Sequence, residues 1–199
     1  MTYYNQNAWA SDFVDCNYSS GEDCYYTDTN NVAIYDGHGN TRTLWFSCYH
    51  NGYCGVNGAS YTELGRYTSA TTALFISTAC CYMHLSVPDN FTDHGGLNQQ
   101  LGFGGEASMD TGMMDNYYNA SNGTNWYGWI SEMEDKPGWF TGDNTTVAFT
   151  RGSTPTDVTN NRNVCGLKRG TCNSRIGYTV GSYWQYDYYD HGASGCNAP

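Results

Sequence analysis

Two short apolar runs limit what this chain can fold into, because most other segments are rich in Asn, Gly, Ser, Thr and Tyr. The runs are NVAIYD at residues 31–36 and TALFIS at residues 72–77. Each has the length, the β-branched content and the aromatic content of a strand that is buried on both faces. We therefore expect a mostly parallel sheet that is packed between helices.

Three weaker segments add strands to this sheet. They are TLWFSC around Leu44, QQLGFGG around Leu101 and TTVAFT at residues 145–150. Their apolar and β-branched residues are bounded by glycine or polar residues, as is typical of strands. Strands that alternate with helical segments predict an α/β fold.

Helices are harder to recognise in this chain. The clearest candidate is NWYGWISEMED at residues 125–135, where large apolar side chains recur at helical spacing before a Lys-Pro-Gly stop. A second helix is predicted within residues 5–14, because Trp9, Phe13 and Val14 would lie on one side.

The length of 199 residues fits one domain, 1–199, with a core at about residues 31–152. From residue 153 to residue 199 the pattern dissolves into turns and aromatic residues, and a cysteine stands at position 196. We expect this segment to form a C-terminal wrap or hairpin that is pinned to the body.

The charge balance excludes two classes of partner. The formal net charge is −11 and only 14% of residues are charged, with 8 Lys and Arg in no basic cluster. Such a chain has nothing to neutralise a nucleic-acid backbone or an anionic membrane surface. No apolar run approaches the roughly 18 residues of a membrane span, and the first residues lack the pattern of a signal peptide.

The nine cysteines favour an oxidising compartment. Three pairs are close in sequence and lie in turn-rich segments, so we expect disulfides between Cys16 and Cys24, Cys48 and Cys54, and Cys165 and Cys172. Five to seven residues separate the partners, which is wider than the spacing of zinc sites. We therefore expect an extracellular or cell-surface protein in its mature form.

The three remaining cysteines are Cys80, Cys81 and Cys196. An odd total leaves at least one thiol free or bonded to another molecule. A bond from Cys81 to Cys196 would tether the tail and leave Cys80 reduced, whereas a bond from Cys80 to Cys196, or to another chain, would block its thiol. Adjacent residues at a strand end point in opposite directions, so only one of Cys80 and Cys81 should reach a site.

Sequons for N-glycosylation give little information. They stand at Asn17, Asn90, Asn119, Asn122 and Asn144. About four would arise by chance from the content of Asn, Ser and Thr in a chain of this length.

The chemistry-bearing residues follow the two apolar runs. The first run leads to His38-Gly39 and the second to Ala79-Cys80-Cys81. In a parallel sheet the carboxyl ends of the strands meet at one edge, so an imidazole and a thiol should lie there together. A cysteine nucleophile needs a general acid and backbone N–H donors, and a glycine beside the histidine lets substrate approach the main chain.

The other histidines, and the aspartates that could bind metal, are less informative. His94 and His191 also precede glycine, but without an apolar strand before them. His50 and His84 stand near Cys48 and Cys81, and Asp36 and Asp110 could contribute to calcium binding, but no spacing supports a metal site. We therefore expect no metal and no cofactor.

The motifs VAIYDGHGN and LFISTACC resemble those of the caspase-like cysteine peptidases, which include caspases, legumains, clostripain and gingipains. The histidine precedes the cysteine by 42 positions, similar to the separation of about 50 in caspases. A third block, HGGLNQQLGFGGEAS at residues 94–108, is similar to the segment after the cysteine in secreted relatives. The resemblance covers roughly residues 32–150.

This resemblance implies a caspase-like α/β/α sandwich and an endopeptidase that acts on peptide or protein substrates. Cys80 would be the nucleophile and His38 the general acid, and the amides of Gly39 and Cys80 would bind the oxyanion. Thr78 stands where the caspase signature has glutamine.

Two further functions remain open. A catalytically silent structural subunit of an extracellular filament, sheath or surface layer would suit the Tyr/Asn/Gly-rich exterior and the low charge density, and would self-associate. A carbohydrate-binding module with Trp126, Trp129 or Trp184 as stacking platform would need a β-sandwich, which the strand and helix alternation argues against.

Overall fold

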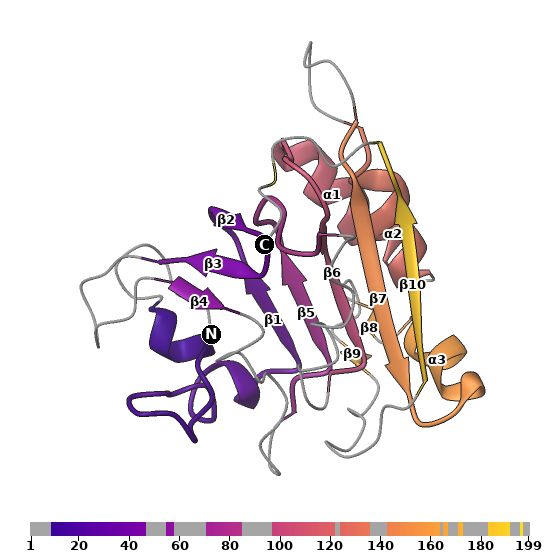
Figure 1. The fold of residues 1–199 in the computed structure, drawn as a ribbon. Helices are drawn as coiled ribbons and strands as arrows, with labels where there is room; N and C mark the ends of the chain where they lie inside the picture. Colours follow the sequence, from indigo (N-terminus) through magenta and orange to yellow (C-terminus); the bar gives the residue numbers. More distant parts are fainter. Residues whose placement is uncertain are drawn as a thin grey trace.

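The computed structural model describes residues 9–46, 55–57, 71–84, 97–121, 124–135, 143–163, 165–166, 171–172, 183–191 and 196. At its centre is a five-stranded sheet in the order β1-β5-β6-β7-β10 (Figure 1). These strands are Val32–Tyr35 (β1), Leu74–Ser77 (β5), Gln99–Phe103 (β6), Thr146–Gly152 (β7) and Tyr183–Tyr189 (β10).

The sheet is mixed but mostly parallel. β1, β5 and β6 are parallel neighbours, β7 is antiparallel to β6, and β10 is antiparallel to β7. Four of the five strands therefore run in the same direction, and β7 alone runs against them. This confirms the predicted α/β class.

Two smaller sheets lie outside the central one. Gly39–Asn40 (β2), Thr43–Trp45 (β3) and Gly55–Asn57 (β4) form an antiparallel three-stranded sheet after the end of β1. Cys165–Gly166 (β8) pairs with Thr171–Cys172 (β9). The strand predicted around Leu44 therefore forms, but it does not join the central sheet.

Three α-helices occur in the described residues: Thr111–Ala120 (α1), Asn125–Glu132 (α2) and Pro155–Asn161 (α3). α2 confirms the helix predicted at residues 125–135. The Asp110 carboxylate accepts a hydrogen bond from the N–H of Met113 and so caps α1. In place of the helix predicted at residues 5–14, the described residues contain a short 3₁₀ helix at Ala10–Phe13 (η2), and a second 3₁₀ helix follows at Thr27–Thr29 (η3).

Alternating side chains of the central sheet build two apolar cores. Leu74 and Ile76 of β5 pack on the side of α1 and α2, where Trp129 is fully buried. Phe75 points to the opposite face and packs with Phe13. A period of two along the strand thus separates the two cores.

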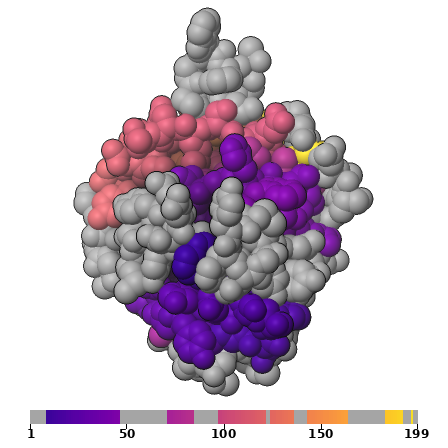
Figure 2. All heavy atoms as spheres, turned by 90° about the vertical axis from the view of Figure 1, so that its left-hand side faces the viewer, coloured from indigo at the N-terminus to yellow at the C-terminus, as the bar shows by residue number. Residues whose placement is uncertain are grey.

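The second face is covered differently from the expected sandwich. Within the described residues it is covered by η2 and by Leu44 of β3, while α1 and α2 lie on the other face. Figure 2 views the molecule from the side of this N-terminal segment, which occupies the lower part of that view in indigo. Short turns and a disulfide at Cys16–Cys24 hold the segment in place of a regular helix.

The two apolar runs, residues 31–36 and 72–77, differ in burial. All four residues of β5 are buried, as predicted, but Ile34 of β1 is 51% exposed. The prediction that NVAIYD is buried on both faces is therefore wrong. Among the strands in the described residues, β1 ends the order of the sheet and has β5 as its neighbour on one side.

The C-terminal segment is part of the sheet itself. β10 pairs with β7 along its whole length, from Tyr183 opposite Gly152 to Tyr189 opposite Thr146. The central sheet therefore continues beyond residue 152, where the sequence pattern places the end of the core. Cys196 then forms a disulfide with Cys81, which confirms the predicted attachment of the tail.

A contact beyond β10 adds a polar attachment. The His191 ring lies between two carboxylates, with Nε2 at 2.7 Å from Glu134 Oε1 and Nδ1 at 3.6 Å from Asp143 Oδ2.

None of the helices in the described ranges is both long enough and apolar enough to cross a membrane.

Candidate active site

The loops that follow β1 and β5 emerge at the same edge of the sheet. The two strands are parallel and in register, with Tyr35 opposite Ser77. The backbone N–H of Thr78 donates to Tyr35 O at 3.0 Å, and the Thr78 hydroxyl donates to Asp36 Oδ1 at 2.6 Å. The segments that follow β1 and β5 therefore stay hydrogen-bonded for one residue beyond the ladder, just before His38 and Cys80.

Gly39 brings the histidine loop against the cysteine loop. A Cβ at this position would lie 2.6 Å from Ala79 Cβ, 2.5 Å from Thr43 O and 3.6 Å from Cys80 O. No side chain fits in that space without a shift of the backbone. The close approach therefore depends on glycine and places the main chain of His38-Gly39 directly beside Cys80.

Two backbone N–H groups at this contact are outside the regular ladders. The N–H of Trp45 donates to His38 O at 3.0 Å, which makes Gly39 and Leu44 a non-hydrogen-bonded pair of β2 and β3. The Gly39 N–H is therefore not used by β3. The backbone N–H of Cys80 likewise has no acceptor among the described residues.

Cys80 is the free cysteine of the described chain and is partly exposed. Its Sγ accepts a hydrogen bond from the N–H of Ala107 at 3.4 Å and lies 3.6 Å from Ala107 O, to which the thiol donates. Ala107 follows β6, the third parallel strand. The loops after β5 and β6 thus meet at the sulfur, and the loop after β1 lies against the backbone of Cys80.

The next residue turns away from this site. Cys81 has a φ of 63°, its N–H donates to Gly105 O at 2.9 Å, and its sulfur is bonded to Cys196. The left-handed backbone is uncommon for a residue other than glycine and produces the sharp turn. Of the two pairings that the sequence left open, the structure has Cys81 bonded to Cys196, so Cys81 is buried toward the body while Cys80 remains reduced.

The backbone of His38 is fixed on both sides, while its side chain is exposed. His38 O accepts from the N–H of Trp45 and from the hydroxyl of Tyr35 at 2.8 Å. Burial raises the pKa of Tyr35 to about 12, so this hydroxyl keeps its proton. The imidazole has no hydrogen-bond partner among the described residues, so it is available to a ligand at the edge of the sheet.

Several predicted positions lie elsewhere. Cys16 and Cys24 form the predicted disulfide. Cys165 and Cys172 lie directly opposite one another in the β8–β9 ladder, and a bond between them stays a prediction. The candidates that fall outside the described residues are Cys48, Cys54, His50 and His94.

The five sequons differ in solvent exposure. Asn17 and Asn119 are exposed and stay predictions, whereas Asn90 and Asn122 lie outside the described residues. Asn144 is fully buried, and its Nδ2 donates to Ser108 O and Met133 O, both at 2.9 Å. Asn144 is therefore corrected from a glycosylation candidate to a structural side chain that joins two loops.

Comparison with known proteins adds no assignment. A scan against protein-family models finds no match, and searches of curated proteins and of solved structures find none either.

Sequence reasoning missed three supports of the site. Ala107 contacts the sulfur only through its backbone, so its residue type carries no signal. The Asp36 carboxylate was considered for calcium and instead accepts the Thr78 hydroxyl. Tyr35 was assigned to the strand alone, although a tyrosine at a buried strand end needs a partner for its hydroxyl.

Proposed function

We propose that this protein is an extracellular cysteine endopeptidase of the caspase-like class, with Cys80 as nucleophile and His38 as general acid. The contact of Gly39 with Ala79 and Cys80 at the shared edge of β1 and β5 carries the proposal. It joins a reduced thiol, an exposed imidazole and two backbone N–H groups outside the ladders within one short stretch of surface.

The chemistry that these groups support is acyl transfer. The thiol proton passes to His38 and Sγ of Cys80 forms a bond to the carbonyl carbon of the scissile peptide. The N–H groups of Gly39 and Cys80 donate to the oxyanion. When the C–N bond breaks, His38 protonates the leaving amine, and water then hydrolyses the thioester and restores the thiol.

The surroundings of Cys80 suit such a cycle. The thiol is held by Ala107 through hydrogen bonds of 3.4 and 3.6 Å, which are long and easily exchanged for a substrate. Catalytic hydrogen bonds are often formed only in the substrate complex, so a separate thiol and imidazole are compatible with activity.

The disulfides support the extracellular location. Cys16–Cys24 and Cys81–Cys196 are both bonded, and such bonds persist in oxidising compartments. Cys80 stays reduced because its nearest cysteine in sequence is already paired with the tail.

The test is cleavage of a mixed peptide library, read by mass spectrometry, together with alkylation by iodoacetamide. We expect cleavage after one preferred side chain and modification at Cys80. Cys80→Ser should lower kcat/KM by at least about 10³-fold, and His38→Ala by about 10²–10⁴-fold.

His191→Ala is the matched control. Like His38, His191 is a histidine followed by glycine, but it stands far from Cys80 in the sequence. It should retain activity. If Cys80 resists alkylation in the folded protein, or if cleavage persists in Cys80→Ser, the proposed chemistry is wrong.

One observation favours the second function, a silent structural subunit. β10 lies at the end of the strand order and carries four exposed aromatic side chains, Tyr183, Trp184, Tyr188 and Tyr189. An edge strand can pair with another chain, and aromatic residues are enriched at protein interfaces. Light scattering should then report large assemblies that Trp184→Ser with Tyr188→Ser disperses; a monomer at all concentrations would exclude this function.

A further inference from the structure

A free thiol stands directly beside a disulfide in this chain. Cys80 is the free cysteine of the described residues, and the next residue, Cys81, is bonded to Cys196. Thiolates attack disulfides and exchange partners with them. The three sulfurs therefore admit other arrangements with the same number of bonds, in which the Cys80 sulfur is no longer a thiol.

A bond from Cys80 to Cys196 is within reach of the backbone. The Cα atoms of Cys81 and Cys196 are 5.6 Å apart. Consecutive Cα atoms lie about 3.8 Å apart, so the Cα atoms of Cys80 and Cys196 are at most about 9.4 Å apart. Disulfides join Cα atoms up to about 6.8 Å apart, so a movement of about 3 Å or less brings this pair into range.

Both sulfurs contact the loop at residues 104–107, which follows β6. The Cys80 Sγ lies 3.4 Å from N and 3.6 Å from O of Ala107. The Cys196 Sγ lies 3.5 Å from Gly104 O. The thiol and the bonded sulfur are therefore held along the same short stretch of backbone.

Of the two sulfurs in the bond, that of Cys196 is the better target for the thiolate. Cys196 is partly exposed, whereas Cys81 is only 3% exposed. A bond between Cys80 and Cys81 would also join Cα atoms about 3.8 Å apart, which is shorter than disulfides normally span. Attack at Cys196 therefore gives a bond between Cys80 and Cys196.

We propose that Cys196 exchanges its bond between Cys81 and Cys80 and so blocks and releases the Cys80 thiol. The thiol loses its proton, and its Sγ forms a bond to Sγ of Cys196 while the bond from Cys81 to Cys196 breaks. The electron pair of the broken bond stays on Sγ of Cys81, which takes up a proton. One disulfide and one thiol exist before and after, so nothing is oxidised or reduced overall.

The backbone of Cys81 favours this exchange. Its φ of 63° is in the left-handed region, which residues other than glycine adopt at a cost. The disulfide and the hydrogen bond of its N–H to Gly105 O hold this conformation. Exchange removes the first of these and leaves a buried thiol, which is a common environment for a free cysteine.

The exchanged form would keep the tail attached but lack the candidate nucleophile. This consequence for activity rests on the proposed function, whereas the exchange itself does not. A peptide substrate that reacts with the Cys80 thiol would shift the population toward the form in which Cys196 is bonded to Cys81.

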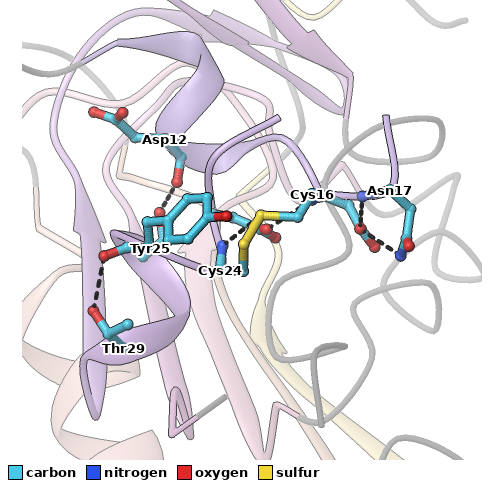
Figure 3. Close-up of a disulfide and its surroundings, with 9 residues drawn as sticks. Asp12, Cys16, Asn17, Cys24, Tyr25 and Thr29 are labelled. Carbon is cyan, nitrogen blue, oxygen red and sulfur yellow. Dashed lines mark hydrogen bonds between the residues drawn. A yellow bond between two sulfur atoms is a disulfide. The ribbon is translucent and has the colours of Figure 1, made fainter. Parts of the chain in front are cut away.

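The Cys16–Cys24 disulfide is an internal control for the exchange (Figure 3). Its labelled neighbours carry carboxyl, amide and hydroxyl groups and no thiol; they are Asp12, Asn17, Tyr25 and Thr29. This bond should therefore keep its partners under conditions in which Cys196 exchanges.

The experiment locates the free thiol of the full chain after several hours at about pH 8.5 without oxidant or reductant. Mild acid then stops the exchange, because the thiolate is the attacking species, and N-ethylmaleimide labels the free thiol in denaturant. Peptic digestion and fragmentation between residues 80 and 81 in the mass spectrometer show which cysteine carries the label.

We expect the label at both positions, with Cys81 labelled in about 10% of chains, as for a minor state of a two-state equilibrium. The Cys16–Cys24 bond should be unchanged. Label at Cys80 alone after incubation would overturn the proposal.

Two variants test the reach of the tail. In Cys81→Ala, produced under the same oxidising conditions as the natural chain, Cys196 should bond to Cys80, and iodoacetamide should no longer modify Cys80. Cys80→Ser is the control, and it should keep the bond from Cys81 to Cys196 with no label at either residue. Free thiols at both Cys80 and Cys196 in Cys81→Ala would contradict the exchange.

The position of the label is read without a peptidase assay, so exchange and peptidase activity fail separately. If the natural chain cleaves peptides, Cys81→Ala should cleave them only after mild reduction by dithiothreitol frees Cys80. Full cleavage by Cys81→Ala without reduction would count against the exchange, whereas absence of cleavage by the natural chain would count against the proposed function alone.

Discussion

At the scale of single residues, the candidate site depends on side chains that have no catalytic chemistry. Gly39 permits a backbone contact that any Cβ would prevent, and Tyr35 supports the following loop through its hydroxyl. Thr78 and Asp36 join the two loops just beyond the sheet. The positions of His38 and Cys80 are therefore set by neighbours that a search for reactive residues would pass over.

The first prediction concerns Gly39→Ala. The added methyl group would lie 2.5 Å from Thr43 O and 2.6 Å from Ala79 Cβ, so the two loops must separate. We expect a loss of about 1–3 kcal/mol in the free energy of unfolding, as for other overpacked sites, measured by urea denaturation. Any peptidase activity should fall by more than the loss of folded protein explains.

Gly112→Ala is the control for this change. Gly112 lies in the exposed first turn of α1, where the nearest atom to a new Cβ is the Asp110 Oδ1 end of a side chain, at 3.1 Å. Its stability should stay equal or rise slightly because alanine favours helix. Equal effects of the two substitutions would contradict the proposed close contact.

The second prediction concerns pH and Asp23. Its pKa is raised from 3.8 to about 8 in the folded state, by burial and by Asp28 and Asp15. Between these values the folded state binds more protons than the unfolded state, so this group lowers stability as pH rises and its full penalty is present above about pH 8. Asp23→Asn should therefore exceed the natural chain in stability by up to a few kcal/mol at about pH 8.5.

The measurement is urea unfolding of both proteins across this pH range. The difference between them should shrink as pH falls from about 8 and should vanish below 3.8, where the carboxyl group is protonated in the folded and the unfolded chain. A difference that does not change with pH would mean that the carboxylate is not destabilised by its burial.

At the scale of elements, parallel strands bring distant loops to one edge of the sheet. The loops after β1, β5 and β6 contribute Gly39, Cys80 and Ala107, and each follows its own strand by a few residues. The tail is attached to the same region, because Cys196 is bonded to Cys81. The order of strands therefore also decides where the C-terminal segment is attached.

The third prediction compares the two disulfides. Cys81–Cys196 closes a separation of 115 residues and Cys16–Cys24 closes one of 8. Because the entropy lost by the unfolded chain grows with loop length, Cys81→Ala with Cys196→Ala should destabilise the fold by about 2 kcal/mol more than Cys16→Ala with Cys24→Ala. Urea denaturation measures both losses of stability, and the reverse order would exclude the chain-entropy explanation.

At the scale of the whole molecule, the apolar segments were predictable and the polar ones were not. The strands β1, β5, β6 and β7 and the helix α2 follow from local composition. β5, β6, β7 and α2 each bury at least two large apolar residues, and β1 buries Ala33 and Tyr35. α1 was missed since, within it, only Met113 and Tyr117 are buried, and α3 is short and contributes Val158 as its buried apolar residue. Their stability comes from packing on the sheet and from capping.

β10 is a further example of a segment whose place in the fold could not be predicted from its residue types. Its sequence, YWQYDYY, lies in the segment predicted as a C-terminal wrap or hairpin, and its side chains are exposed or partly exposed. It nevertheless pairs along the whole of β7, so it completes the sheet. Hydrogen bonding between strands depends on the backbone, and residue types reveal it only weakly.

The amino-acid sequence alone determined the α/β class, the residues of most strands, the pairing of Cys16 with Cys24 and the two segments that carry His38 and Cys80. Local patterns suffice for these features, since strand propensity and short loops involve neighbouring residues. Tertiary structure alone decided that β1 and β5 are neighbours, that Gly39 contacts Cys80, and that four aspartates of the N-terminal segment are buried. These contacts join distant residues or depend on burial, and both are set by how the whole chain packs.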